Sequence, residues 1–269
     1  MTLIVSEVSR FGIAMAADSA VTDTYPTNWQ LTSGAAVPPT VRIGAQKIHP
    51  IHSVGGAISA WGIASVGMPT DKNANIPVDS FLPDFIGLIK PNETFDDIGR
   101  RLAEEVNKRI VVGEVEGGFH LAGYAQEGGK RYPILYHIHT GHSGDSHKAF
   151  QLYRDYPFDS GFSIDQWLEA LSKGAFAWLR NGNFDEYAYF SKSLNELMNT
   201  LKEKTGFICP DYEQFTTPLE ARGRFLKLQL QTICEFYRHS NRLETIAMPI
   251  SWLTISHDGS IEDFEPIKL

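Results

Sequence analysis

The sequence lacks the features of several specialised protein classes. It contains only two cysteines, Cys209 and Cys234, which make a poor disulfide framework and suit a reducing compartment. No run of about 18 apolar residues is present, so we expect no transmembrane helix. The start has no basic region followed by an apolar region, so we expect no secretory signal. These absences predict a cytoplasmic location.

An excess of positive charge is also missing. The 24 lysines and arginines are outnumbered by 32 acidic residues, giving a formal net charge of −8. Nucleic acids and anionic membranes attract clustered basic residues, so neither is an expected partner. The 269 residues, 42% of them hydrophobic, suffice for a substantial core. No repeat, low-complexity segment or linker composition divides the chain, which predicts one domain over residues 1–269.

Short apolar segments separated by glycine turns predict most of the strands. Residues 2–9 and 12–18 read as a β-hairpin with Gly12 in the turn. The other predicted strands cover residues 47–51, 57–62, 119–124, 134–139, 246–256 and 261–264. The stretches 23–42 and 63–77 show little periodicity and are predicted to be loops.

Helical periodicity dominates the later part of the chain. A helix is predicted over 78–89, and Thr94 is the predicted N-cap of a second helix that runs to Ile110. Three more helices are predicted over 164–179, 184–201 and 219–238. Together with the hairpins, they indicate an α+β layered fold with an extended helical C-terminal half. Aromatic residues at helical spacing there are predicted to be core: Trp167, Phe176, Trp178, Phe184, Tyr187 and Tyr189.

The predicted N-terminal hairpin has a chemical consequence. Folding back would bring Asp18 near Thr2, which follows the initiator residue Met1. If Met1 is removed, the Thr2 hydroxyl can act as a nucleophile with its own α-amine as the base. That amine titrates near pH 8, close enough to neutrality to accept the proton.

Several segments together resemble a known family. The sequence begins Thr2-Leu3-Ile4-Val5, and an apolar strand then ends in Asp18-Ser19, sixteen positions after Thr2. Lys47-Ile48, Ser59-Ala60-Trp61-Gly62 and a closing strand with an Asp258-Gly259 turn follow in order. This pattern resembles the β-type subunits of proteasomes and related bacterial ring peptidases, which are N-terminal-nucleophile (Ntn) hydrolases.

The resemblance implies a fold and an activity. It implies a four-layer αββα fold and a threonine-type amidohydrolase or peptidase that acts on a peptide or amide substrate. Thr2 would be the nucleophile, with Asp18 and Lys47 as electrostatic support. Gly62, or next Trp61, would supply a backbone N–H near the oxyanion. No cofactor is implied. Homo-oligomerisation, with a ring as one form, is implied, whereas an ATPase partner cannot be identified.

The sequence also departs from the family pattern. Ala20 stands where the family has an arginine, and about 28 residues separate Asp18 from Lys47, so 23–42 would be an insertion. The alternative is therefore a non-catalytic structural or assembly subunit of the same fold. Ser19 is a candidate supporting residue, and the candidates for later residues that hold the N-terminal amine are Ser143, Ser160 and Asp185.

A group of histidines offers a third interpretation. His137 and His139 would share one face of a strand, a spacing that metal sites use. With Asp145, His142 and His147 they could form a metal-dependent hydrolase site. No cysteine accompanies them, so we favour histidines of a surface loop and predict no metal site.

Overall fold

A computed structural model shows how these segments are arranged in space. The residues that it describes are 2–23, 40–67, 76–110, 117–140, 149–182, 187–190, 192–193, 196, 200, 203–204, 218–239 and 246–264.

The first sheet has the N-terminal hairpin at its centre. β1 (Leu3–Ser9) and β2 (Gly12–Ala17) pair antiparallel and are buried along their whole length. β12 (Ala177–Gly182) pairs with β1, and β13 (Ser251–Ile255) pairs with β2 and with β14 (Ile261–Phe264). The resulting order is β12-β1-β2-β13-β14. The predicted hairpin is confirmed, and its continuous apolar runs fit strands that are covered on both faces.

The second sheet contains four of the other predicted strands, those over residues 47–51, 57–62, 119–124 and 134–139. Its order is β11-β10-β9-β6-β5, with β5 (Ile48–Ile51), β6 (Gly56–Trp61), β9 (Gly118–Glu127), β10 (Lys130–His139) and β11 (Gln151–Tyr156). All neighbours are antiparallel. The β9–β10 turn needs two glycines, because Gly128 and Gly129 both have positive φ angles, +58° and +76°.

Both predicted loops contain short strands. β3 (Val21–Asp23) pairs with β4 (Thr40–Arg42), and β7 (Ser65–Val66) pairs with β8 (Ile76–Pro77). The predictions of loops over 23–42 and 63–77 are therefore wrong at these positions. Two or three residues are too few to produce a recognisable alternation. The remaining residues, 24–39 and 68–75, lie outside the described part of the chain.

Two of the described helices, α2 (Phe95–Asn107) and α3 (Ile164–Ser172), begin with a side-chain cap. α1 (Val78–Gly87) precedes α2, and the Thr94 side chain accepts a hydrogen bond from the Asp97 N–H, as predicted. α3 starts with a capping box, and α5 (Pro218–Arg238) is the longest described helix. None of the helices in the described residues combines the length and apolarity needed to cross a membrane.

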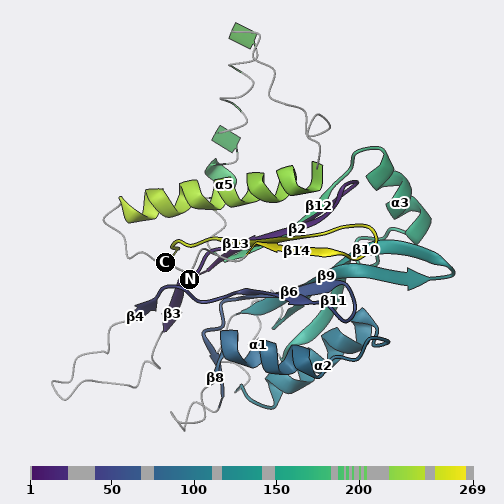
Figure 1. Cartoon of the computed structure of the whole chain (residues 1–269), viewed down its shortest axis with the longest axis horizontal. Coiled ribbons are helices and arrows are strands. Elements are labelled where there is room, and N and C mark those ends of the chain that lie inside the picture. Colours follow the sequence, from purple (N-terminus) through teal and green to yellow (C-terminus); the bar gives the residue numbers. More distant parts are fainter. Residues whose placement is uncertain are drawn as a thin grey trace.

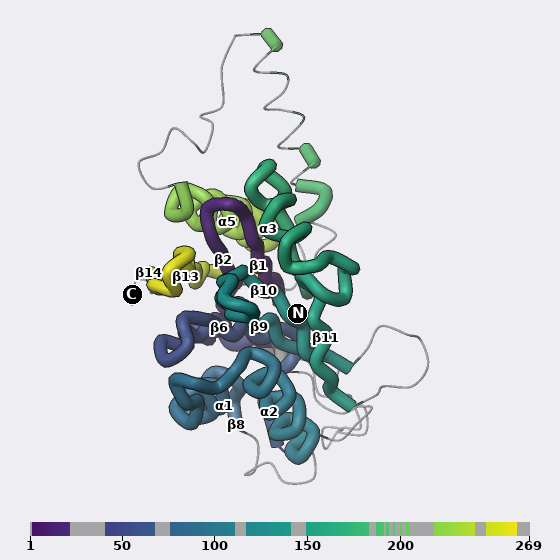
Figure 2. The backbone as a smooth tube through the Cα atoms, turned by 90° about the vertical axis from the view of Figure 1, so that its right-hand side faces the viewer, coloured from purple at the N-terminus to yellow at the C-terminus, as the bar shows by residue number. Residues whose placement is uncertain are grey.

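The elements stack in four layers. In Figure 2, α5, the first sheet, the second sheet and the α1–α2 pair follow one another from top to bottom, and Figure 1 shows the same order. The core between the sheets includes Ile4, Met15 and Leu253 from the first sheet and Ala57 and Leu135 from the second. Two further cores attach α1 and α2 to the second sheet and α5 to the first. β1 and β6 are buried along their whole lengths between these layers.

The prediction of an extended helical C-terminal half is not supported. The helix predicted over 164–179 ends at Ser172, because Gly174 has a φ of +89° and residues 177–182 form β12 against β1. Residues 187–190 are helical, but most of the predicted helix over 184–201 lies outside the described residues.

The aromatic residues of this region only partly belong to the core. Trp167 and Tyr187 are buried, as predicted, whereas Phe176 (54% exposed), Trp178 (40%) and Tyr189 are exposed. The core prediction is wrong for these three. Trp178 belongs to the edge strand β12, where alternate side chains face opposite sides, so helical spacing did not apply. Phe184 lies outside the described residues.

Candidate active site

The N-terminal hairpin brings Asp18 back to the start of β1. The Asp18 N–H donates to the carbonyl oxygen of Leu3 at 3.1 Å, and the Leu3 N–H donates to Oδ1 of Asp18 at 2.8 Å. Asp18 is completely buried, and Thr2 is 6% exposed. The predicted proximity of Thr2 and Asp18 follows from this antiparallel register.

Lys47 connects these two residues. Its Nζ donates to Oδ1 of Asp18 at 2.7 Å and to Oγ1 of Thr2 at 3.3 Å. Lys47 lies directly before β5, and its carbonyl oxygen accepts a hydrogen bond from the Ala60 N–H of β6 at 3.0 Å. The structure therefore brings together Thr2, Asp18 and Lys47, three residues from separate segments of the sequence.

Burial sets the electrostatics of this group. Because its side chain is only 2% exposed, burial lowers the pKa of Lys47, while the charge and hydrogen bond of Asp18 act in the opposite direction. The Asp18 carboxylate also accepts hydrogen bonds from the Ala20 and Ala247 N–H groups, at 2.9 and 3.3 Å. Fixed donors around a buried carboxylate hold it in one orientation, where charge interactions are stronger than in water.

Ser19 supports the site through the backbone of the closing segment. Its N–H and its hydroxyl both donate to the carbonyl oxygen of Ala247, at 3.0 and 3.2 Å. The carbonyl oxygen of Ser19 accepts from the Ala45 N–H at 3.1 Å. Ser19 therefore joins the segment before Lys47 to the segment before β13, and no hydrogen bond to Thr2 is described for it.

Trp61 ends the strand that contacts Lys47, and Gly62 follows it. Trp61 is the last residue of β6, and Gly62 has a φ of +69°, a left-handed conformation that favours glycine. The Trp61 indole N–H donates to Nε2 of His137 at 2.9 Å. Gly62 thus leaves the sheet two residues after Ala60, the partner of Lys47, and its role at an oxyanion stays a prediction.

The remaining supporting candidates do not join the group. Ser160 lies in the turn after β11, where its hydroxyl donates to the carbonyl oxygen of Pro157 at 2.6 Å. β11 runs from Gln151, opposite His139 and thus at the Trp61 end of the sheet, to Tyr156, opposite Leu135. Ser160 therefore lies beyond the other end of this strand. Ser143 and Asp185 lie outside the described residues.

Histidines of the second sheet lie between the two sheets. The ring of His137 lies 5.1 Å from that of His120 and 4.1 Å from that of His139, measured between centroids. All three are buried, so the prediction of surface-loop histidines is wrong for His137 and His139. Among the described residues no group of three or more histidine, cysteine or acidic side chains could hold a metal ion. His142, His147 and Asp145 lie outside those residues.

Four residues near this group were missed by the sequence analysis. Nδ1 of His120 lies 2.9 Å from Oγ of Ser6, and Nε2 lies 2.6 Å from Oδ1 of Asn181. Gly182 follows Asn181 and pairs with Leu3 across the β1–β12 ladder. A polar residue inside the apolar runs of β1 and β9 was the available signal, because a buried polar side chain needs a partner.

The His120 ring predicts a pH dependence of stability. Burial lowers the pKa of His120 to about 4 from 6.5, with a neighbouring His139 acting in the same direction. The unfolded chain therefore binds more protons than the folded chain between these values. The contribution to stability is present above about pH 6.5 and is lost as the pH falls towards 4, by on the order of 3 kcal/mol. Between pH 6.5 and pH 4.5, the free energy of unfolding in urea should fall less for His120→Gln than for the unaltered protein.

Asp155 provides a control of opposite sign. Burial raises its pKa to about 6 from 3.8, helped by the charge of Asp159. Its contribution is largest below pH 3.8 and is lost as the pH rises through 6, so Asp155→Asn should steepen the fall in stability on acidification. If the stability of His120→Gln and of the unaltered protein depended equally on pH, the contribution assigned to His120 would be contradicted.

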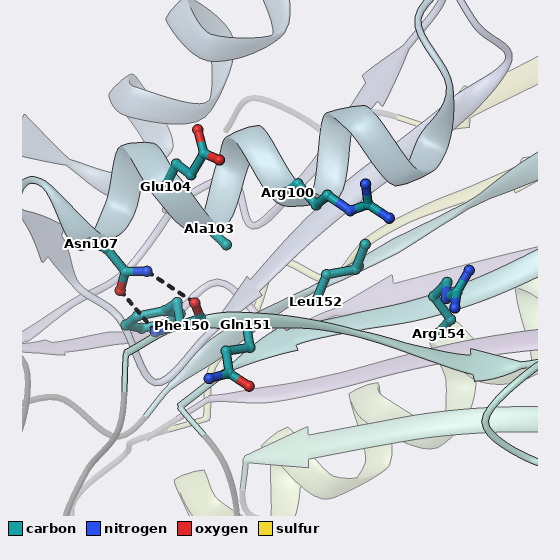
Figure 3. A pocket seen from close by; sticks show the side chains of 8 residues that line it. All are labelled: Arg100, Ala103, Glu104, Asn107, Phe150, Gln151, Leu152 and Arg154. Atoms are coloured by element: carbon teal, nitrogen blue, oxygen red, sulfur yellow. Dashed lines mark hydrogen bonds between the residues drawn. The ribbon is translucent and has the colours of Figure 1, made fainter.

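A groove elsewhere on the surface is separate from this site. It has a volume of about 360 Å³ and lies between α2 and β11, on the outer face of the second sheet (Figure 3). Asn107 spans its end, with its side chain bonded to both the N–H and the carbonyl oxygen of Phe150. None of the residues lining the groove belongs to the Thr2 group.

Comparisons with known proteins concern the fold of the chain. No protein-family model and no curated protein sequence matches the chain. Among solved structures, the chain matches a Gly-1 mutant of Anbu from Hyphomicrobium sp. strain MC1, with a TM-score of 0.50 and 13% sequence identity. The match covers 99% of this chain and 87% of that chain. With its two antiparallel sheets and outer helices, the chain therefore has an Anbu-like fold.

Proposed function

We propose that this chain is a threonine-type amidohydrolase or peptidase in which Thr2 becomes the nucleophile after removal of Met1. The observation that carries the proposal is the hydrogen bond from Lys47 Nζ to Thr2 Oγ1, with Asp18 bonded to the same ammonium group. The Asp18 carboxylate holds the ammonium group beside the buried Thr2 hydroxyl. In this position the cation can stabilise the negative charge that develops on the hydroxyl oxygen when it loses its proton.

The proposed reaction uses the groups in sequence. The freed α-amine of Thr2 accepts the hydroxyl proton as Oγ1 bonds to the carbonyl carbon of the substrate. Lys47 stabilises negative charge on Oγ1, and the Gly62 N–H is the proposed donor to the carbonyl oxygen of the tetrahedral intermediate. The C–N bond then breaks, the amine product takes the proton, and water hydrolyses the ester on Thr2.

The alternative is a structural or assembly subunit without activity. One observation favours it: Gly182 and Ala247, two later residues that lie beside Thr2 and Asp18, contribute backbone atoms. The family resemblance would lead us to expect side chains there that hold the N-terminal amine. A chain that keeps Met1 would have an amide in place of that amine, and the proposed base would not exist.

Mass spectrometry of the N-terminal peptide separates these two functions. We expect the purified protein to begin at Thr2 and to gain the whole mass of a β-lactone reagent on that residue, because ring opening by Oγ1 leaves an ester. Thr2→Ala should show no such gain. A protein that always begins at Met1, or that labels equally in Thr2→Ala, would overturn the catalytic proposal in favour of the structural one.

The setting of the activity is also part of the proposal. We propose that the chain forms a homo-oligomer, with a ring as one form, and that its substrate is a peptide or amide. The fold similarity alone supports both. The cytoplasm is the proposed location, supported by the presence of only two cysteines, which suits a reducing compartment.

A further inference from the structure

The end of β12 lies against the main chain of Thr2. Gly182 is paired with Leu3 and has a φ of +96°. A β-carbon at this position would overlap the carbonyl oxygen of Thr2. The position therefore admits glycine alone, and any shift of Gly182 towards β1 would displace the main chain that carries the nucleophile.

The neighbouring Asn181 attaches this end of β12 to the second sheet. Oδ1 of Asn181 lies 2.6 Å from Nε2 of His120, whose Nδ1 lies 2.9 Å from Oγ of Ser6. One neutral tautomer satisfies all three residues: Nε2–H donates to Asn181, and Nδ1 accepts from the Ser6 hydroxyl. His120 lies on β9 and Ser6 on β1, so the hydrogen bonds join three strands from two sheets.

A serine, a histidine and an asparagine in a row could also suggest a second nucleophilic triad. Ser6 and His120 are both completely buried between the sheets, so a substrate cannot reach the hydroxyl. The buried row is instead suited to holding strands in place, since satisfied buried polar networks fix one arrangement of a core.

We propose that His120 and Asn181 are positioning residues for Thr2. Their hydrogen bond fixes the end of β12, and Gly182 at that end fixes the main chain of Thr2. β12 is the edge strand of its sheet and pairs with β1 on one side only. Among the described residues, Asn181 gives this end a second attachment, to the second sheet. This inference rests on the proposed function of Thr2, because displacement of a nucleophile by about 1 Å can cost about a hundredfold in rate.

The test measures how fast a β-lactone acylates Thr2. Asn181→Leu keeps the approximate size of the side chain but removes the acceptor, and we expect the rate at saturating reagent to fall about 10- to 100-fold. The reagent concentration giving half the maximal rate should change much less, because the proposal concerns the position of Oγ1 and not reagent binding. Asn181→Asp retains an acceptor for Nε2 of His120, so its acylation rate should lie close to that of the unaltered protein.

Asn107→Leu is the matched control. It removes two hydrogen bonds to the Phe150 backbone in the groove of Figure 3, away from Thr2. It should lower the melting temperature and leave the acylation rate unchanged. If Asn181→Leu does not fold, Asn181→Ala at this half-buried position takes its place with the same expectations.

The outcomes separate the two hypotheses. A folded Asn181→Leu or Asn181→Ala variant that is acylated at the unaltered rate overturns the positioning role and leaves the proposed function intact. An equal fall in Asn107→Leu also overturns it, because general destabilisation would then explain the effect. No acylation of Thr2 in the unaltered protein overturns the proposed function and this inference with it.

Discussion

Lys47→Met should reduce the rate of Thr2 acylation by about 10²- to 10³-fold. The substitution removes the ammonium group that donates to Oγ1 at 3.3 Å, and the loss of one such stabilising donor typically has an effect of this size. The fold should survive, because the Asp18 carboxylate keeps three backbone donors, from Leu3, Ala20 and Ala247. The rate is measured by mass spectrometry of the N-terminal peptide over time.

Lys130→Met is the control for this experiment. Lys130 also pairs with an aspartate, Asp165, but both side chains are exposed, and surface pairs contribute little. Its acylation rate should match that of the unaltered protein. A folded Lys47→Met variant whose rate lies within threefold of the unaltered rate would refute the role of Lys47.

The largest loss of stability is expected from Arg222→Met. Arg222 of α5 donates through Nε and Nη2 to both carboxylate oxygens of Glu7 on β1. The Glu7 side chain is only 2% exposed, so removal of its partner leaves a carboxylate buried between the first sheet and α5. Such an unpaired charge costs about 3–5 kcal/mol, which corresponds to a fall of roughly 10 °C in the melting temperature.

Two further variants isolate the cause. Arg224→Met removes the neighbouring arginine, whose exposed pair with Glu220 lies along the same helix, and should change the melting temperature little. Glu7→Leu/Arg222→Met removes both charges and should recover much of the loss, since an apolar pair needs no counter-ion. Calorimetry that finds Arg222→Met as stable as Arg224→Met would contradict the importance of the buried pair.

The three residues of the candidate site could be found from the sequence because local structure brings them together. A hairpin of known register relates Thr2 to Asp18, and Lys47 immediately precedes a strand that pairs with β6. The family resemblance indicated the catalytic roles of these three residues, and their positions along the strands predicted that they lie close together. The position of Gly62 at the end of β6 could likewise be predicted, because the local pattern indicated a strand there.

The other polar partners could not be found in this way. His120 bonds to Ser6, 114 positions away, and to Asn181, 61 positions away. No local period links such residues, so only the packing of two sheets brings them into contact. β12 was missed because it is short, lies at a sheet edge and gains its strand conformation from β1, whereas its aromatic residues happened to match helical spacing.

The order of the first sheet has a consequence for synthesis on the ribosome. β1 and β2 are synthesised before their sheet neighbours β12 and β13, which begin at Ala177 and Ser251. At roughly 5–20 residues per second, the N-terminal hairpin waits on the order of 10 s for its second neighbour. Asp18 gains its Ala247 donor only at that late stage. The nascent chain therefore carries an incomplete site until Ala247 has been synthesised, and its exposed strand edges are the part that a chaperone would need to cover.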